Sequence, residues 1–219
     1  MVRYRPYVIL NAAMTLDGKI VTVKGDSSIS SRTDLIRVHE LRANVDAILI
    51  GINTVETDNP MLTAKNGKKN PIRVIVDSEA RIKFTTKIMR SCNIISTVIA
   101  VSHKATNSKL EKIKSRGASV LVCGMNNKVY LKKLLKILKN IGVNRLLVEG
   151  GGEINWSMLT NGLVDEIIVT IAPTIVGGRS AITLVEGIGF TKVNNSLKLK
   201  LQKIRKIDSE VILYYKIIN

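Results

Sequence analysis

The feature that most constrains this chain is a series of short aliphatic runs separated by segments with helical spacing. The runs predict strands over 7–10, 47–51, 73–77, 97–101, 119–123, 145–148 and 166–171. The intervening segments predict helices over 34–43, 110–116, 130–140 and 155–161. Strands that are apolar on both sides are typical of a parallel sheet covered by helices on both faces. The pattern therefore predicts a three-layer α/β fold with a mostly parallel sheet.

The C-terminal part of the chain has a different pattern. Residues 197–204 and 210–217 alternate between apolar and polar side chains, which predicts an antiparallel pair of strands at the end of the sheet. The length of 219 residues fits one large α/β domain, so we expect a single domain over residues 1–219. In the helix at 34–43 we expect Leu35, Val38 and Leu41 to face the core.

The net charge is strongly positive, at +17 from 34 basic and 17 acidic side chains. Such a charge fits a nucleic-acid-binding protein, an enzyme that attracts an anionic small substrate, or a lysine-rich surface. Lys132 and Lys136 lie opposite leucines at helical spacing, and Lys198 and Lys200 alternate with leucines as on a strand. The charge is thus spread over several elements, which disfavours nucleic acid as the partner.

Several other classes of protein are disfavoured. No run reaches the roughly 18 apolar residues of a membrane span, and the run at 7–10 is too short for a signal peptide, so we expect a cytoplasmic protein without a membrane partner. The two cysteines and two histidines are isolated, so we expect no metal site. The motifs of serine hydrolases, P-loop enzymes and zinc proteases are missing.

The sharpest local motif is three glycines, Gly150 to Gly152, between an aliphatic strand and a helix. Glycines let phosphate oxygens approach the main chain, and a helix N-terminus offers N–H donors and a partial positive charge. The motif therefore favours phosphate binding, although a tight turn would also use glycine. A standard Rossmann domain is disfavoured because the G-x-G-x-x-G motif does not follow the first strand.

Two polar loops are further candidates. Residues 51–60 follow a buried strand, at the place where open α/β sheets usually bind ligands, but they could also form an ordinary loop. Residues 172–179 contain a proline and two glycines after the seventh strand, and they could cover a site or simply connect to the tail.

Taken together, six segments resemble the riboflavin-biosynthesis pyrimidine reductase family. They occur in the family's order and cover roughly residues 7 to 190: Met14–Lys19, Leu41–Leu49, Gly51–Pro60, Arg73–Ser78, Val148–Gly152 and Gly162–Pro173. The resemblance implies a dihydrofolate-reductase-like fold, NADPH as cofactor and a homodimer. It implies reduction of a ribosylamino group to a ribitylamino group on a phosphorylated pyrimidine. The sequence has no zinc deaminase motif before the reductase-like segments, so the resemblance leads us to expect the stand-alone archaeal and fungal type.

The resemblance also implies roles for individual residues. The positions that match cofactor contacts are Ala12, Thr54, Asp58, Ser78, Gly150, Gly151, Gly152 and Glu153. The positions that match substrate contacts are Asp26, Arg42, Leu62, Lys65 and Glu149. Lys65 departs from the arginine often found there, but it could still act as a point charge.

The implied chemistry is hydride transfer to C1′ of a ribosylamine that has opened to an imine. Asp58 is a candidate proton donor if it is buried, because burial favours the protonated form of a carboxyl group. In the stand-alone type reduction precedes deamination, so we expect the 2,5-diamino pyrimidinone as substrate. The deaminated uracil compound, a pterin, a non-catalytic nucleotide-sensing role and a basic nucleic-acid-binding module stay open as alternatives.

Overall fold

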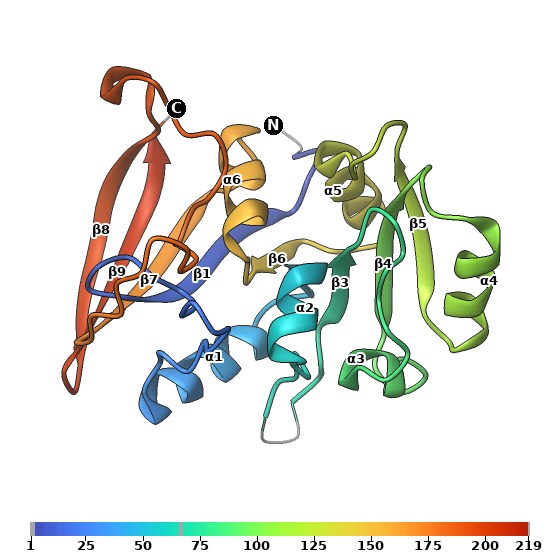
Figure 1. The fold of residues 1–219 in the computed structure, drawn as a ribbon, viewed down its shortest axis with the longest axis horizontal. Coiled ribbons are helices and arrows are strands. Elements are labelled where there is room, and N and C mark those ends of the chain that lie inside the picture. The colour runs from blue at the N-terminus through green and yellow to red at the C-terminus, as the bar shows by residue number, and fades with distance from the viewer. Residues whose placement is uncertain (1–2, 66–67, 219) are drawn as a thin grey trace. The chain divides into compact units, whose positions relative to one another are not determined.

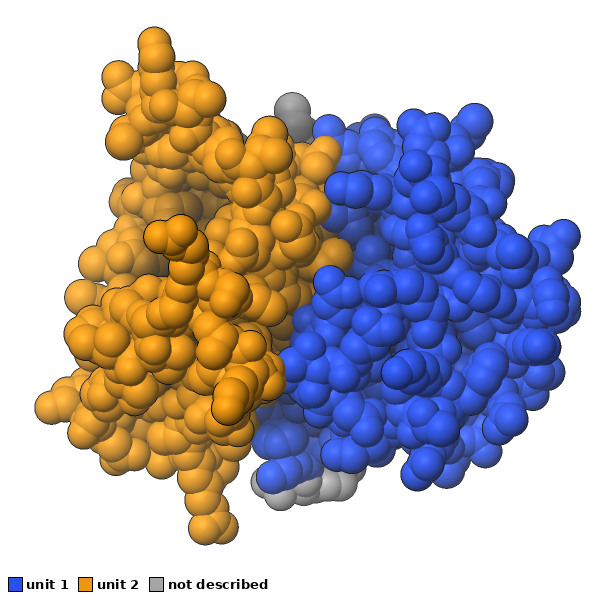
Figure 2. Space-filling view, viewed as in Figure 1, with its two compact units in different colours: residues 1–7, 39–147 blue, residues 8–38, 148–219 orange. Residues whose placement is uncertain are grey.

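The computed structural model describes residues 3–65 and 68–218, and Figure 1 shows their helices and strands. The chain forms two compact units, each made of two separate stretches of sequence. Unit 1 comprises residues 1–7 and 39–147, and unit 2 comprises residues 8–38 and 148–219 (Figure 2). The structure does not test whether the two units form the single domain predicted over residues 1–219, so the single domain stays a prediction.

Unit 1 contains five strands in the order β5-β4-β3-β2-β6. They are β2 (Ala47–Gly51), β3 (Ile72–Val76), β4 (Thr97–Ser102), β5 (Ser119–Gly124) and β6 (Arg145–Val148). Its helices are α2 (Ile52–Asp58), α3 (Lys87–Arg90), α4 (Asn107–Ser115) and α5 (Leu131–Asn140). The neighbouring strands from β2 to β5 run parallel. The centres of β2, β3 and β4 are completely buried, as expected for aliphatic strands covered on both faces.

One charged side chain lies inside the core of unit 1. Arg73 on β3 is fully buried, and its guanidinium donates to the hydroxyls of Thr97 and Ser91 and to the carbonyl oxygens of Ile88 and Ile95. Burial lowers the pKa of Arg73 to about 10. The neutral oxygens around the guanidinium meet its donors, so it joins β3 to β4 and α3 without a carboxylate partner in the part of the chain that the structure describes.

Unit 2 contains four strands in the order β1-β7-β9-β8. They are β1 (Tyr7–Thr15), β7 (Glu166–Ala172), β8 (Lys198–Ile207) and β9 (Glu210–Ile218), with α6 (Gly152–Thr160) and a 3-10 turn at Val193–Asn195. β1 and β7 are parallel, whereas β9 is antiparallel to both β7 and β8. These directions confirm the predicted mostly parallel sheet with antiparallel C-terminal strands. The first half of α1 (Arg32–Ala43) also belongs to unit 2.

Several predictions about individual elements were wrong, among them the start of α4, which is Asn107 rather than residue 110, and the end of β1, which is Thr15 rather than residue 10. Residues 52–58 form helix α2 instead of a polar loop, and α6 begins at Gly152, earlier than the predicted start at residue 155. Leu35 of α1 is 49% exposed, and the helix instead buries Val38 together with the polar side chains of Asp34 and Arg37. A helix with a polar buried face cannot be oriented from its leucines alone.

Asp17 joins two loops of unit 2 that the sequence marked separately. Its carboxylate accepts hydrogen bonds from the Thr15 hydroxyl at 2.6 Å and from the amides of Val176 and Gly177 at 3.1 and 2.7 Å. The Thr15 hydroxyl bond, followed by the Val176 amide, lowers the pKa of Asp17 to about 2. The loop after β1 is thereby fastened to the loop after β7.

We predict that Asp17→Asn destabilises the protein at neutral pH and that this difference depends on pH. A carboxyl group whose pKa is lowered on folding stabilises the fold above its unfolded value of 3.8, and the contribution is lost as the pH falls toward about 2. Thermal unfolding should therefore show a lower Tm for the variant at pH 7 and a converging Tm as the solution is acidified from pH 4 downward. A Tm difference that stayed constant over this range would contradict the assignment.

Candidate functional site

Three of the predicted cofactor residues lie at one edge of unit 1. β2 and β3 are parallel with Gly51 opposite Val76, so α2 and the turn after β3 begin at the same edge. The Arg81 guanidinium donates to the side-chain oxygen of Asn53 at 2.7 Å. The backbone amide of Lys87 donates to the side-chain oxygen of Asn59 at 2.8 Å. These bonds fasten α2, which carries Thr54 and Asp58, to the segment that carries Ser78.

The turn after β3 is organised by a buried carboxyl group. Asp77 is completely buried; one of its oxygens accepts from the Ile82 amide at 2.8 Å, and the other has no hydrogen-bond partner among the described residues. Burial raises the pKa of Asp77. The next residue, Ser78, accepts from the Ser102 hydroxyl at its carbonyl and from the Val129 amide at its hydroxyl. Ser78 is therefore held in place at the ends of β3 and β4.

The predicted substrate residues of unit 1 form a second group. His39 Nδ1 lies 2.9 Å from the Thr63 carbonyl oxygen, which is an acceptor, so this nitrogen carries the proton. Arg42 follows His39 by three residues and lies next to it on the surface of α1. The structure thus brings Arg42 toward the loop that contains Leu62 and Lys65.

The residues of that loop differ in what they can offer a ligand. Leu62 is buried and has a positive φ of 53°, so its side chain belongs to the core of unit 1. Lys65 is exposed and available as a cation. The guanidinium of Arg73 reaches the Met61 carbonyl at 3.4 Å, which anchors the start of the loop to the core.

Two of the three glycines in unit 2 are required by the fold. Gly150 has a φ of 85°, which favours glycine. A Cβ on Gly152 would lie 2.6 Å from the Glu186 side chain and 2.8 Å from the Thr183 carbonyl oxygen, so close packing requires glycine there. Gly150 and Gly152 are therefore explained by the fold, and the case for a phosphate rests on the start of α6.

The start of α6 fits an anionic ligand with a neighbouring donor group. Gly151 caps the helix without a side-chain hydrogen bond, and Glu153 in the first turn is exposed. Asn155, in the same turn, is only 1% exposed; its amide nitrogen donates to the Leu184 carbonyl, but its side-chain oxygen has no partner among the described residues. This side chain lies 3.4 Å from the point where a Cβ on Gly150 would stand. The helix end suits a phosphate, and the Asn155 oxygen suits a hydroxyl or amide N–H of the same dinucleotide.

The remaining predicted residues of unit 2 lie on β1, in an exposed turn and before the glycines. Ala12 is half-buried on β1 opposite Val169, and Glu149 is half-buried directly after β6. Asp26 is exposed and forms its bonds with Thr22 and Ser28, and the Ser28 amide lowers its pKa. These bonds keep Asp26 within its own turn.

The conditional role of Asp58 as proton donor is not supported, because Asp58 at the end of α2 is exposed. Sequence reasoning also missed several residues that shape the site: His39, Asn53, Asn59, Arg81 and Asn155. Asn59 was a usable signal, because it is the C-cap of α2 with a φ of 43°, a left-handed conformation that asparagine tolerates at helix ends. Among the described residues, no three histidine, cysteine or acidic side chains gather as a metal site.

Comparison with known proteins decides the family. The model of the RibD C-terminal domain matches residues 6–213. The chain belongs to the RibD C-terminal domain family. A relative from Methanothermobacter thermautotrophicus, named 2,5-diamino-6-ribosylamino-4(3H)-pyrimidinone 5′-phosphate reductase, is 47% identical over 215 residues, covering 96% of this chain and 98% of the relative. A protein of the same name from Aquifex aeolicus is 38% identical over 98% of both chains.

Solved structures of the RibD C-terminal domain family have the same fold. RibD from Acinetobacter baumannii superposes with a TM-score of 0.85 at 26% identity, over 98% of this chain and 58% of that one. The riboflavin biosynthesis reductase Rib7 from Saccharomyces cerevisiae superposes with a TM-score of 0.77 at 25% identity, over 100% of this chain and 92% of that one. These similarities confirm the predicted fold class. Among the described residues, no helix is long and apolar enough to cross a membrane.

Proposed function

We propose that this protein is an NADPH-dependent reductase of 2,5-diamino-6-(5-phosphoribosylamino)pyrimidin-4(3H)-one, forming the ribitylamino product of riboflavin biosynthesis. The observation that carries the proposal is the 47% identity, over nearly the full length of both chains, to a reductase named for this substrate. The positions of the predicted site residues support it. Unit 1 fastens α2 to the Ser78 turn, and unit 2 places the start of α6 beside a buried acceptor oxygen.

We assign the cofactor to the start of α6, to α2 and to the Ser78 turn. When bound, the reduced nicotinamide would supply the hydride that reduces C1′ of the opened ribosylamine's imine, and a proton from solvent would complete the ribityl amine. The first-turn amides of α6 would hold the pyrophosphate, and the Asn155 oxygen would accept a hydrogen bond from a hydroxyl or amide of the cofactor. The main chain at Ala12 would contact the nicotinamide, and Thr54 and Asp58 would contact the cofactor from α2.

We assign the substrate to Arg42, Leu62, Lys65, Asp26 and Glu149. Arg42 and Lys65 bind the ribose phosphate by charge, and the buried Leu62 sets the course of the loop between them. The carboxylates of Glu149 and Asp26 orient the pyrimidine by accepting hydrogen bonds from its amino groups. These side chains bind and orient, which is the protein's part when the cofactor carries the hydride.

We predict that the purified protein oxidises NADPH when the diamino ribosyl phosphate is added, as followed by the loss of NADPH absorbance. NADH in place of NADPH should give a lower kcat/KM. The deaminated uracil compound and dihydropterin are the comparison substrates, and a higher kcat/KM for either would replace the proposed substrate. NADPH binding without oxidation of any of them would indicate a nucleotide sensor. A steep salt-dependent affinity for nucleic acid without oxidation would indicate a nucleic-acid-binding module.

We predict that Arg42→Ala raises KM for the substrate about tenfold or more and leaves kcat within about twofold. A phosphate contact remote from C1′ acts equally on the ground state and the transition state, so its loss weakens binding without slowing chemistry. Arg42→Lys is the matched control and should recover part of the affinity through its remaining charge. A drop in kcat with an unchanged KM would remove Arg42 from the phosphate site.

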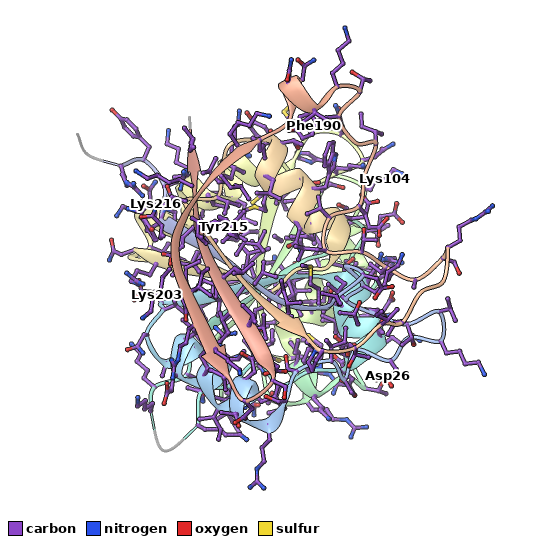
Figure 3. The ribbon with its side chains drawn as sticks, turned by 90° about the vertical axis from the view of Figure 1, so that its left-hand side faces the viewer. Asp26, Lys104, Phe190, Lys203, Tyr215 and Lys216 are labelled. Carbon is purple, nitrogen blue, oxygen red and sulfur yellow. The ribbon has the colours of Figure 1, made fainter. Side chains whose placement is uncertain are left out.

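We further propose that the protein is cytoplasmic and acts as a homodimer through the β8–β9 hairpin (Figure 3). One face of the hairpin is apolar: Leu201 lies opposite Tyr215, Ile204 opposite Leu213, and these β8 side chains are 45% and 59% exposed. Lys203 points to the other face, where its ammonium lies 5.8 Å from the centre of the Tyr214 ring. Two copies of a chain with charge +17 repel each other, so a largely apolar face, whose one β8 cation is Lys206 opposite Val211, is the favourable place for contact.

Sedimentation equilibrium should give twice the chain mass of 24.1 kDa. Leu201→Glu should shift the mass to that of one chain because it places a charge in the apolar contact, whereas Lys203→Glu on the other face should not. A mass of one chain for the unchanged protein would refute the dimer. A dimer unaffected by Leu201→Glu would place the contact elsewhere.

A further inference from the structure

Unit 2 contains a buried polar network that the proposed reaction does not use directly. It joins Asp34 and Arg37 of α1 to Asn11 of β1 and Thr170 of β7. Asp34 and Thr170 are completely buried, Asn11 is 5% exposed and Arg37 is 7% exposed. An ion pair at this depth in an aliphatic core needs a physical reason, because removing two charges from water is unfavourable.

The guanidinium of Arg37 is the centre of this network. Its Nε donates to Asp34 Oδ1 at 2.7 Å, both terminal nitrogens donate to Asn11 Oδ1 at 3.1 Å, and one of them also reaches the Thr170 hydroxyl at 3.1 Å. The Thr170 hydroxyl donates to Asp34 Oδ1 at 3.0 Å. Arg37 therefore fixes Asn11 and Thr170 relative to α1 at the same time.

Stability alone accounts poorly for such a network. Apolar side chains of similar volume often replace a buried ion pair without loss of stability, or with a gain. Apolar packing, however, does not fix the orientation of the groups that it brings together. A planar guanidinium holds its acceptors at fixed angles, so the network specifies where β1 lies over α1.

The anchored residue is the immediate neighbour of Ala12. Successive side chains of a strand point to opposite faces of the sheet. Arg37 therefore holds Asn11 on one face of β1, and the side chain of Ala12 lies on the opposite face. We propose that Arg37 is a positioning residue, which holds β1 through Asn11 so that the main chain at Ala12 meets the nicotinamide ring. This inference rests on the proposed function.

The same helix offers a matched control. The Ser31 amide and hydroxyl donate to the two carboxylate oxygens of Glu210 at 2.8 and 2.6 Å, and Glu210 is 3% exposed. This contact ties the start of α1 to β9 and does not involve Asn11. Glu210→Gln therefore weakens a buried contact of the same helix and leaves the anchor of β1 in place.

The test compares Arg37→Lys with Glu210→Gln in steady-state kinetics with NADPH and with NADPH deuterated at the transferred position. A lysine keeps the charge near Asp34 but loses the fork that holds Asn11. We expect both variants to have a lower Tm. At a temperature at which both are folded, Arg37→Lys should lower kcat about tenfold and raise the deuterium isotope effect on kcat, because a displaced ring makes hydride transfer slower. Glu210→Gln should keep the parental kcat and isotope effect.

A parental kcat and isotope effect in Arg37→Lys would overturn the positioning role, whatever its Tm. If Arg37→Lys does not fold, Asn11→Ala and Asn11→Asp test the same positioning role while Arg37 stays unchanged. Asn11→Ala should show the kinetic defect, and Asn11→Asp, which keeps an acceptor oxygen, should stay within about twofold of the parent. Equal kcat values and isotope effects for Asn11→Ala and Asn11→Asp would also overturn the positioning role. Failure of the parent protein to oxidise NADPH with any pyrimidine would instead overturn the proposed function, and the inference with it.

Discussion

The structure depends on the burial of aliphatic strands on both of their faces. The centres of β2, β3 and β4 in unit 1 and the start of β1 in unit 2 are completely or almost completely buried. Such strands leave little room for chemistry along their length, so polar groups that could meet a ligand collect where strands end and turns or helices begin. Thr54, Ser78 and the Gly150–Glu153 bend all lie at such ends.

Polar side chains that are buried in spite of this constraint have an ordering role. Arg73 joins two strands and a helix in unit 1, and it also reaches the loop that leads to Leu62. In unit 2, Arg37 joins helix α1 to the strands β1 and β7. Each guanidinium is surrounded by acceptors, which compensates for its lost hydration. In both units, the segments that carry predicted ligand contacts are thereby tied to an interior that cannot easily shift.

The fold could be predicted from the sequence because its strands are short, aliphatic and separated by helical periodicity. α2 was missed because a helix of only seven residues with a polar surface is too short to show a detectable helical period in its apolar residues. Leu35 was placed inward wrongly because the buried face of α1 consists largely of Asp34 and Arg37, which a count of apolar residues cannot show. The start of α6 was placed too late because glycine is a poor helix former.

The candidate site could be predicted only in part. Resemblance supplied its residues, and the structure shows how bonds such as Arg81–Asn53 and His39–Thr63 bring segments together, which no spacing along the chain reveals. The glycines had looked like evidence for a phosphate, yet Gly152 is required by its contact with Glu186. The unpartnered oxygen of Asn155 depends on three-dimensional packing and has no signature in the sequence.

The central claim is that this protein reduces C1′ of an opened sugar phosphate with a hydride from a reduced nicotinamide. The most direct measurement is to follow the label from cofactor deuterated at nicotinamide C4 by NMR of the isolated product. The account predicts one deuterium at C1′ of the ribityl chain in each product molecule. Product without deuterium, or with deuterium on the pyrimidine ring, would contradict it.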